Sequence, residues 1–312
     1  MRKLLLPFSI LYFLVIKVRN WCYDVGILKE FKLAVPVISV GNLSTGGTGK
    51  TPFTIALISI LQKEYAHIVV ISRGYKRKSK GAQLVSLKGE IKTSVDVAGD
   101  EPYLIANRFK KNVSVVVAEQ RINGFELIKK ENPDLVILDD GFQHRSIYRD
   151  LDIVLMNGNH PYSKDYLLPV GYLREPVTSL KRANCLVITK KNVVFQSAIP
   201  NYIAVETKFD YHPKIDKTAE YIAVSAIANN QEFTDSLLQD GIQIKTKLFF
   251  PDHHRYSEND FKDISKNRFI TTEKDYYKLR NFISNLSYRR IDIEMDTNLR
   301  KFVEYQLKQK NK

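Results

Sequence analysis

The sequence of 312 residues predicts an α/β fold that is divided into two units. Three observations support this prediction. A glycine-rich segment joins a short apolar run to a helical pattern near residue 45, and further apolar runs of strand length alternate with helical patterns up to about residue 200. The pattern then starts again after Phe195. The length allows two domains with separate cores, and a composition of 44% hydrophobic and 26% charged residues is typical of a globular protein.

The first expected element is an apolar segment from Leu4 to Ile16, which is flanked by cations. As a helix, its thirteen residues would span about 20 Å, which is shorter than a hydrocarbon layer of about 30 Å. No small-x-small cleavage site follows, which argues against a signal peptide. We expect residues 1–30 to form a helix at a membrane interface, with Trp21 at the boundary. A buried N-terminal helix is the alternative.

The glycine-rich segment GNLSTGGTGKTP at residues 41–52 follows the apolar run 34–40. A buried strand, a glycine-rich turn and a helix in this order predict a P-loop, whose backbone N–H groups surround a phosphate at the positive end of the helix. Lys50 is expected to reach the terminal phosphates of a nucleotide, and Thr51 to bind Mg²⁺. The usual spacing has glycine where this chain has Ser44. The loop residues expected to bind the nucleotide are Ser44, Thr45, Gly46, Gly47, Thr48, Gly49, Lys50 and Thr51.

A carboxylate pair, Asp139 and Asp140, follows the apolar run 135–138. Open α/β sheets bind their ligands at the carboxyl ends of parallel strands, so we expect this pair beside the P-loop, with metal coordination favoured over a turn cap. Gln143 and His144 continue the same edge and are also expected at the nucleotide. They would position phosphates or the water ligands of the metal, or satisfy backbone groups.

Other apolar runs complete the two expected sheets. The first unit has runs at 67–72, 113–118, 152–156 and 184–189. In the second unit, alternating segments at 198–209 and 288–295 are expected as strands that join the units, and they enclose runs at 223–226, 242–250 and 268–271. The predicted division is an N-terminal helix at 1–30, a P-loop domain at 31–205 and a smaller α/β domain at 206–312.

A P-loop alone does not distinguish a kinase, a GTPase, a motor or a ligase, so the acceptor side has to be identified. Asp100 in the segment Gly99-Asp-Glu-Pro102 is either a helix N-cap or a base that accepts the proton of an attacking hydroxyl. Asp252, His253 and His254 follow a predicted strand. Adjacent histidines rarely share a metal ion, so a histidine that pairs with the base is the favoured interpretation.

Seven segments together resemble the tetraacyldisaccharide 4'-kinases, the lipid A 4'-kinase family of Gram-negative bacteria. The resemblance extends from the apolar N-terminus to at least Lys278. It implies a peripheral enzyme on the cytoplasmic face of the inner membrane that uses ATP and Mg²⁺ to phosphorylate the 4'-hydroxyl of a tetraacylated glucosamine disaccharide 1-phosphate. The segments are GNLSTGGTGKTP at 41–52, SRGY at 72–75, GDEP at 99–102, LDDGFQH at 138–144, PVGYLREP at 169–176, FPDH at 250–253 and TEKD at 272–275.

The resemblance also implies a fold and individual roles. A β-ribbon is expected between the P-loop domain and its smaller partner. Asp100 is expected as the general base and His253 as its partner. The other expected residues are Lys50, Asp139 and Asp140 for catalysis, Thr51 and Asp139 for the metal, and Arg73, Tyr75, Arg121, Arg174 and Glu175 for the substrate cleft.

The formal net charge of +14, from 48 basic and 34 acidic residues, indicates an anionic partner. Anionic headgroups and a phosphorylated glycolipid fit this charge, and no nucleic acid and no obligate protein partner are inferred. Cys22 and Cys185 lie far apart, which fits a reducing compartment. Two alternatives remain. A nucleic-acid-dependent ATPase would need a groove of interleaved cations and aromatics, and a soluble P-loop kinase or ligase for a small metabolite would not need the apolar N-terminus.

Overall fold

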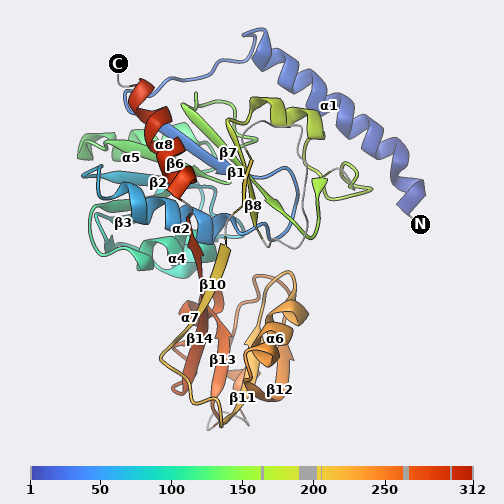
Figure 1. The fold of residues 1–312 in the computed structure, drawn as a ribbon, viewed down its shortest axis with the longest axis vertical. Coiled ribbons are helices and arrows are strands. Elements are labelled where there is room, and N and C mark those ends of the chain that lie inside the picture. The colour runs from blue at the N-terminus through green and yellow to red at the C-terminus, as the bar shows by residue number, and fades with distance from the viewer. Residues whose placement is uncertain are drawn as a thin grey trace.

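The structure, a computed structural model, describes residues 2–162, 165–189, 202–204, 206–262, 267–295 and 297–310. It contains a sheet of nine strands and a second sheet of five strands. Figure 1 shows the two sheets one above the other, with helix α1 (Leu6–Asp24) extending along the outside of the larger unit. The predicted α/β class is confirmed.

The larger sheet has the order β4-β3-β5-β2-β6-β1-β7-β8-β9. All neighbours from β5 to β9 are parallel, and only β3 and β4 at one edge are antiparallel. The central strands are buried on both faces, which explains why their sequences are continuous apolar runs. The strands are β1 (Val37–Gly41), β2 (Ile68–Ser72), β3 (Gln83–Leu87), β4 (Glu90–Ile91), β5 (Val113–Val117), β6 (Leu135–Asp139), β7 (Leu151–Asn157), β8 (Cys185–Thr189) and β9 (Tyr202–Ala204).

Helices cover both faces of this sheet. Side chains of α2 (Lys50–Leu61), α4 (Asp100–Arg108) and α8 (Thr297–Lys310) share one core with alternate residues of the strands. Helix α5 (Arg121–Ile128) packs on the other face. The remaining helical segments of the larger unit are η1 (Arg2–Leu5), α3 (Val95–Ala98), η2 (Lys129–Glu131) and η4 (Val177–Arg182).

The smaller sheet has the order β10-β14-β13-β11-β12, and only the pair β10 and β14 is antiparallel. Helix α6 (Asn230–Gln239) packs on one face and α7 (Glu273–Leu279) on the other. The other elements are β10 (Glu206–His212), β11 (Glu220–Ser225), β12 (Gln243–Phe249), β13 (Phe269–Thr272), β14 (Leu286–Glu294) and η5 (Glu258–Phe261).

Two strands connect the units. The expected strand at 198–209 is divided between β9 in the larger sheet and β10 in the smaller one, and residues 198–201 and 205 lie outside the described residues. β10 pairs along its length with β14, and both run between the units (Figure 1). After β14 the chain returns to the core of the larger sheet, where α8 buries Leu299, Val303 and Leu307. The domain boundaries stay a prediction, and this packing favours assigning residues 297–310 to the larger unit.

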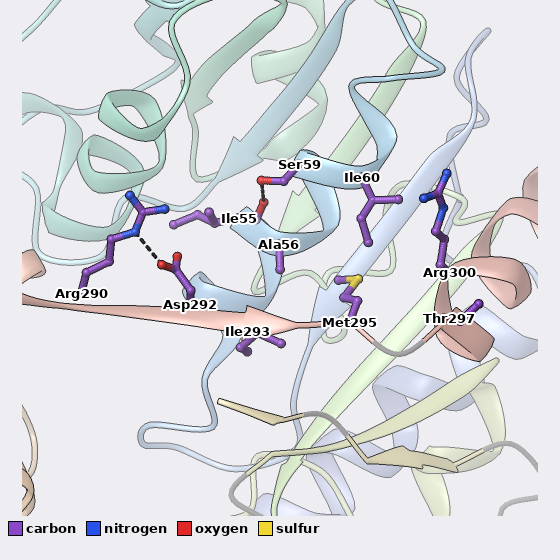
Figure 2. A pocket seen from close by; sticks show the side chains of 10 residues that line it. All are labelled: Ile55, Ala56, Ser59, Ile60, Arg290, Asp292, Ile293, Met295, Thr297 and Arg300. Atoms are coloured by element: carbon purple, nitrogen blue, oxygen red, sulfur yellow. Dashed lines mark hydrogen bonds and ion pairs between the residues drawn. The ribbon is translucent and has the colours of Figure 1, made fainter. Parts of the chain in front are cut away.

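The end of β14 lies against α2. A cavity of about 350 Å³ remains between α2, β14 and the start of α8 (Figure 2). Within it, Arg290 and Asp292 form an ion pair of 2.7 Å. Ile55, Ala56, Ser59 and Ile60 of α2 line the cavity, whereas the P-loop lies at the start of that helix. The cavity is therefore separate from the expected nucleotide site.

Helices α4 and α7 form a direct contact between the units. Arg108, the last residue of α4, donates two hydrogen bonds to the carboxylate of Glu273, the first residue of α7. Both side chains are buried, with exposed fractions of 6% and 7%. Tyr103 and Tyr277 pack edge to face in the middle of the same contact, with ring centroids 5.6 Å apart. A buried charge pair of this kind requires both partners.

We predict that Arg108→Met will lower the free energy of unfolding by about 3–5 kcal/mol, because Glu273 keeps a buried charge without its partner. The double variant Arg108→Met with Glu273→Met should recover most of this loss, while Asp292 keeps its pair with Arg290. Urea unfolding followed by circular dichroism measures both effects. Equal destabilisation of the single and double variants would contradict the prediction.

Candidate active site

The P-loop connects β1 to α2. Gly46 and Gly49 have φ angles of 109° and 79°, in the left-handed region that favours glycine, and Gly49 is the N-cap of α2. A Cβ atom at Gly46 would meet no other atom, so backbone conformation rather than space requires glycine at this position. Lys50 and Thr51 are the first two residues of α2. The loop therefore presents the positive end of a helix, as a phosphate site requires.

Neighbouring segments hold this loop in place. Ser44 forms an isolated antiparallel bridge with Leu173, so its backbone is extended and the position does not require glycine. The side chain of Asn42 donates a hydrogen bond of 2.9 Å to the hydroxyl of Thr48. Thr189, at the end of β8, donates a hydrogen bond of 3.0 Å to the carbonyl of Thr48. The unusual serine is thus explained by strand-like pairing with the segment that carries Arg174.

Asp139 is the last residue of β6 and is buried. Its carboxylate accepts hydrogen bonds from Ser72 at 3.0 Å and from Thr54 at 3.4 Å. Burial, together with the negative charges of Glu101 and Asp140, raises the pKa of Asp139 to about 6. This carboxylate therefore lies in a field that favours a proton or a cation.

Asp140 has a different environment, although it is the next residue. Arg174 donates to its carboxylate at 2.8 and 3.0 Å, and Lys50 Nζ lies 3.5 Å away. Burial opposes ionisation, but the charges of Lys50 and Arg174 hold the pKa of Asp140 well below its usual range. Its φ of 50° places it in the left-handed region, which is strained for a residue other than glycine. Asp140 links the P-loop lysine to the loop of Arg174.

Asp100 and His253 meet where the two units face each other. His253 Nδ1 lies 2.9 Å from Asp100 Oδ2, within hydrogen-bond distance. The backbone of His253 has a φ of 66°, and its N–H donates to the carbonyl of Ala226 at 3.1 Å. The ring of Tyr75 packs edge-on to the imidazole at 5.3 Å. The fold therefore brings together the two residues that the sequence predicted as a pair.

The interpretation of Asp100 as a helix N-cap is wrong. Gly99 is the N-cap of α4, and Asp100 is its first helical residue. The carboxylate of Asp100 points to the smaller unit instead of bonding to the first turn. Of the two adjacent histidines, His254 stacks on Phe250 with ring centroids 4.5 Å apart and lies 3.4 Å from Asp260. His253 is therefore the ring that reaches Asp100.

The residues expected in the substrate cleft differ in exposure. Arg73 and Tyr75 are exposed, and Arg174 is partly exposed. Arg121 is buried and donates to the carbonyls of Ala118 at 2.9 Å and Asp139 at 3.4 Å, and burial lowers its pKa to about 10. Glu175 is fully buried. In this structure Arg121 and Glu175 hold other protein groups, and only the first three are open to a substrate.

Gln143 and His144 also bond to nearby protein groups. Gln143 donates to the carbonyl of Asn42 at 2.9 Å. His144 Nε2 lies 2.8 Å from the Ser146 hydroxyl, and burial together with nearby arginines lowers the His144 pKa to about 4. Gln143 thus satisfies a backbone group, as one of the two expectations has it, whereas His144 contacts a side-chain hydroxyl. A role of either residue at the nucleotide stays a prediction.

Sequence reasoning missed two cations at this site. Lys278 Nζ lies 3.1 Å from Asp100 Oδ2, and Lys274 Nζ lies 3.3 Å from His253 Nε2. Lys274 belongs to the TEKD segment at 272–275, and Lys278 follows it by four residues, which places both on one face of a helix. This four-residue spacing was the sequence feature that could have indicated both lysines.

Comparisons with known proteins agree with the fold and with the family resemblance seen in the sequence. The family model described as tetraacyldisaccharide-1-P 4'-kinase matches residues 1–310. A protein of Aquifex aeolicus named tetraacyldisaccharide 4'-kinase is 42% identical, over 97% of this chain and 98% of its own length. A protein of Flavobacterium psychrophilum with the same name is 37% identical, over 97% of this chain and 95% of its own length.

A solved structure gives the same result for the fold. It is described as the apo form of LpxK from Aquifex aeolicus in complex with ATP, and it matches this chain with a TM-score of 0.85 and 40% identity. The match covers 98% of this chain and 99% of the other. The resemblance found in the sequence is thereby confirmed. The chain belongs to the tetraacyldisaccharide-1-P 4'-kinase family.

Proposed function

We propose that this protein transfers the γ-phosphate of ATP to the 4'-hydroxyl of a tetraacylated disaccharide 1-phosphate, a precursor of lipid A. The observation that carries this proposal is the position of Asp100, which is held by His253 on the side of the sheet that carries the P-loop. Its neighbour Glu101 is close enough to Asp139 to raise the pKa of that carboxyl. This supports a position of the proposed base near the proposed nucleotide site. Membership of the family and the ATP complex of a related structure support the same assignment.

The transfer requires little covalent chemistry from the protein. As the acceptor oxygen forms its bond to the γ-phosphorus, its O–H bond breaks and Asp100 takes the proton, while ADP leaves with the electrons of the broken O–P bond. The Asp100 side chain is 11% exposed, so it is shielded but still open to an acceptor. Lys50 would stabilise the charge on the phosphates, as an electrostatic contribution to catalysis.

Mg²⁺ is the cation we propose to accompany ATP, and Asp139 and Thr51 are the residues that would hold it. Their oxygen donors suit this ion, and the negative field around Asp139 favours a cation. In the part of the chain that the structure describes, no group of three or more acidic, histidine or cysteine side chains could hold a metal. Magnesium sites of nucleotide enzymes commonly take their remaining ligands from phosphates and water. When bound, the ion would neutralise phosphate charge.

We also propose that α1 lies in the interface of the inner membrane on its cytoplasmic face. None of the described helices is both long enough and apolar enough to cross a bilayer. Helix α1 continues to Asp24, beyond the apolar segment, and several of its polar side chains bond to the rest of the protein. Ser9 donates to the carbonyl of Leu167 at 3.0 Å and Tyr12 to the carbonyl of Arg174 at 2.8 Å.

The other side of α1 is apolar and exposed. Only Ser9 of this helix is buried, so the alternative of a buried N-terminal helix is wrong. An apolar face with flanking cations is suited to the lipid and headgroup boundary. The exposed apolar residues of this segment include Leu4, Leu6, Phe8, Ile10, Leu11, Leu14, Val15, Val18 and Trp21.

A hollow beside α1 supports a lipid acceptor. It has a volume of about 360 Å³ and lies between α1 and the segment at 165–177, and Ile10, Phe13 and Leu167 contribute to its lining. The same segment carries Arg174, whose guanidinium reaches Asp140. We therefore propose that an acyl chain of the acceptor occupies this hollow while its sugar lies near the site. A small soluble metabolite would make no use of it.

We predict that Asp100→Asn will lower kcat by about 10²–10⁴-fold, because the amide cannot accept the proton, while ATP affinity changes little. Lys50→Ala should also abolish transfer, because it removes the cation at the phosphates. The measurement is transfer of label from γ-labelled ATP to tetraacyl disaccharide 1-phosphate in mixed micelles. Asp96→Asn is the matched control, because Asp96 is an exposed carboxylate of the neighbouring helix α3.

Native-like transfer by Asp100→Asn would remove the role of this residue as base. Labelling of a water-soluble acceptor in place of the glycolipid would favour the small-metabolite alternative. Turnover of ATP that depends on added nucleic acid would favour the ATPase alternative.

We predict that the triple variant Phe8→Ser, Leu11→Ser, Val15→Ser will bind vesicles of anionic lipid at least about tenfold more weakly, because it loses three exposed apolar side chains. Flotation of vesicles through a sucrose gradient measures the bound fraction, and added salt should weaken binding further. Leu127→Ser on α5 is the control for loss of an exposed leucine elsewhere. Unchanged flotation of the triple variant would refute the placement of α1.

A further inference from the structure

Lys278 is placed in a nearly closed environment on the inner side of α7. Its ammonium lies 3.1 Å from Asp100 Oδ2, 2.9 Å from Asp275 Oδ1 and 3.3 Å from the carbonyl of His254. It also lies over the ring of Tyr256, 5.3 Å from the centroid. The side chain is only 9% exposed. A buried lysine that directly contacts the carboxylate of another unit is costly to desolvate, so its contacts with Asp100 and Asp275 must offset that cost.

Lys274 lies one turn earlier on the same helix and approaches the other side of the imidazole. Its ammonium is 3.3 Å from His253 Nε2, 3.2 Å from Asp252 Oδ1 and 3.9 Å from Asp100 Oδ2. The two lysines therefore contact both members of the Asp100 and His253 pair.

We propose that Lys274 and Lys278 are positioning residues that fix the protonation and orientation of the Asp100 and His253 pair before phosphoryl transfer. This proposal rests on the proposed role of Asp100 as the base. Neither lysine is assigned contact with the reacting atoms. Each acts through the group that it holds.

The first argument concerns the two carboxylate oxygens of Asp100. His253 and Lys278 both bond to Oδ2. Within the described residues, no hydrogen bond reaches Oδ1. The two donors thus hold the carboxylate by one oxygen and leave the other oxygen available to an acceptor hydroxyl. Such orientation matters because a displacement of about 1 Å in a reacting group can cost about 10²-fold in rate.

The second argument concerns the histidine tautomer. A lysine ammonium has three donors and no acceptor, so Nε2 must accept where it bonds to Lys274. The proton of the neutral ring is then on Nδ1, from which it is donated to Asp100. Asp252 Oδ2 lies 3.5 Å from the same Nε2 and would favour a proton there, but Lys274 also pairs with Asp252. Lys274 therefore selects the tautomer that Asp100 needs.

The third argument is electrostatic. Burial disfavours the charge on Asp100, but the hydrogen bond from His253 and the charges of Lys278 and Lys274 outweigh it, and the pKa of Asp100 is lowered. The other titratable groups around this cluster include Asp252, Asp275, Tyr256, Tyr75 and Lys76. Loss of Lys278 would remove one of the contributions that lower this pKa, so Asp100 would take up a proton at higher pH.

The contact of α4 with α7 explains how the lysines are held in register. The two helices run in opposite directions, because Asp100 at the start of α4 meets Lys278 near the end of α7, whereas Arg108 at the end of α4 meets Glu273 at the start of α7. Ion pairs at both ends prevent α7 from sliding along α4. The position of Lys278 relative to Asp100 is thereby fixed.

The test uses the full-length protein with Lys278→Met, Lys278→Arg and Lys274→Met, and Lys247→Met on exposed strand β12 as the control. Label transfer to the glycolipid is measured between pH 5 and pH 8, together with ATP affinity. Lys278→Met should lower kcat about 10–100-fold. Its activity should also fall more steeply at low pH: the value of kcat/KM at pH 5 divided by that at pH 8 should be at least about threefold smaller than for the native protein. Lys278→Arg should restore most of the native ratio, and Lys247→Met should equal the native protein.

A second measurement does not depend on activity. In ¹⁵N-histidine spectra, assigned by comparison with His253→Gln, the native protein should show the neutral His253 ring protonated at Nδ1, and Lys274→Met should shift the proton towards Nε2. This spectrum and Lys278→Arg carry the test if Lys278→Met does not fold. A pH-independent loss in Lys278→Met, or an unchanged tautomer with native kcat in Lys274→Met, would overturn the proposal. Absence of transfer by the native protein would instead refute the proposed function and leave the tautomer result to decide the role of Lys274.

Discussion

The carboxylate of Asp100 is the point on which the arrangement of the two units depends. It lies at the start of a helix of the larger unit, yet its hydrogen-bond donors, His253 and Lys278, come from the smaller unit. A carboxylate that is mostly removed from water requires such partners, and here they lie more than 150 residues away in the chain. The electrostatic requirement of one side chain therefore constrains how the smaller unit is placed. The buried pair of Arg108 and Glu273 meets a similar requirement at the far end of the same contact.

The nucleotide side of the site depends on a different set of constraints. Asp139 and Asp140 are neighbours in sequence, but their surroundings differ. Asp139 lies near hydroxyl groups and the carboxylates of Glu101 and Asp140, whereas Asp140 lies near Lys50 and Arg174. Burial acts on both, so the difference comes from the charges around each. The left-handed backbone of Asp140 turns the chain away from the direction of the strand. Asp139 is thus suited to the proposed Mg²⁺, whereas Asp140 pairs with the side chains of Lys50 and Arg174.

Much of the fold was predictable because the central strands are buried on both faces and appear in the sequence as continuous apolar runs. The P-loop was predictable because its glycines follow a local pattern. The strand at 198–209 was only partly predicted, because periodicity does not indicate which of two sheets a short strand joins. The sequence also did not indicate that α8 packs on the larger sheet, since an amphipathic helix shows that it covers a core but does not show which core.

The site was predictable to the extent that its residues lie in recognisable motifs. Asp100 had two interpretations from sequence, and only the fold could decide between them, because a distant histidine supplies its partner. The sequence also did not show which of the expected cleft residues would be buried. Glu175 and Arg121 were expected to face a substrate. In the fold, Glu175 accepts hydrogen bonds from Asn20 and Arg182, and Arg121 donates to backbone carbonyls. Lys278 was missed because a lysine next to tyrosines in a helical pattern resembles an ordinary solvated position.

The return of the chain after β14 has a topological consequence. The smaller unit leaves the larger one through β10 and comes back through the adjacent strand β14, so it is an insertion whose entry and exit are hydrogen-bonded to each other. A unit connected in this way is held at both ends of its chain by strands that pair with each other. Helix α8 locks the exit strand to the parent sheet. A chain shortened before this helix would therefore lose both a cover of the main core and an anchor of the exit strand.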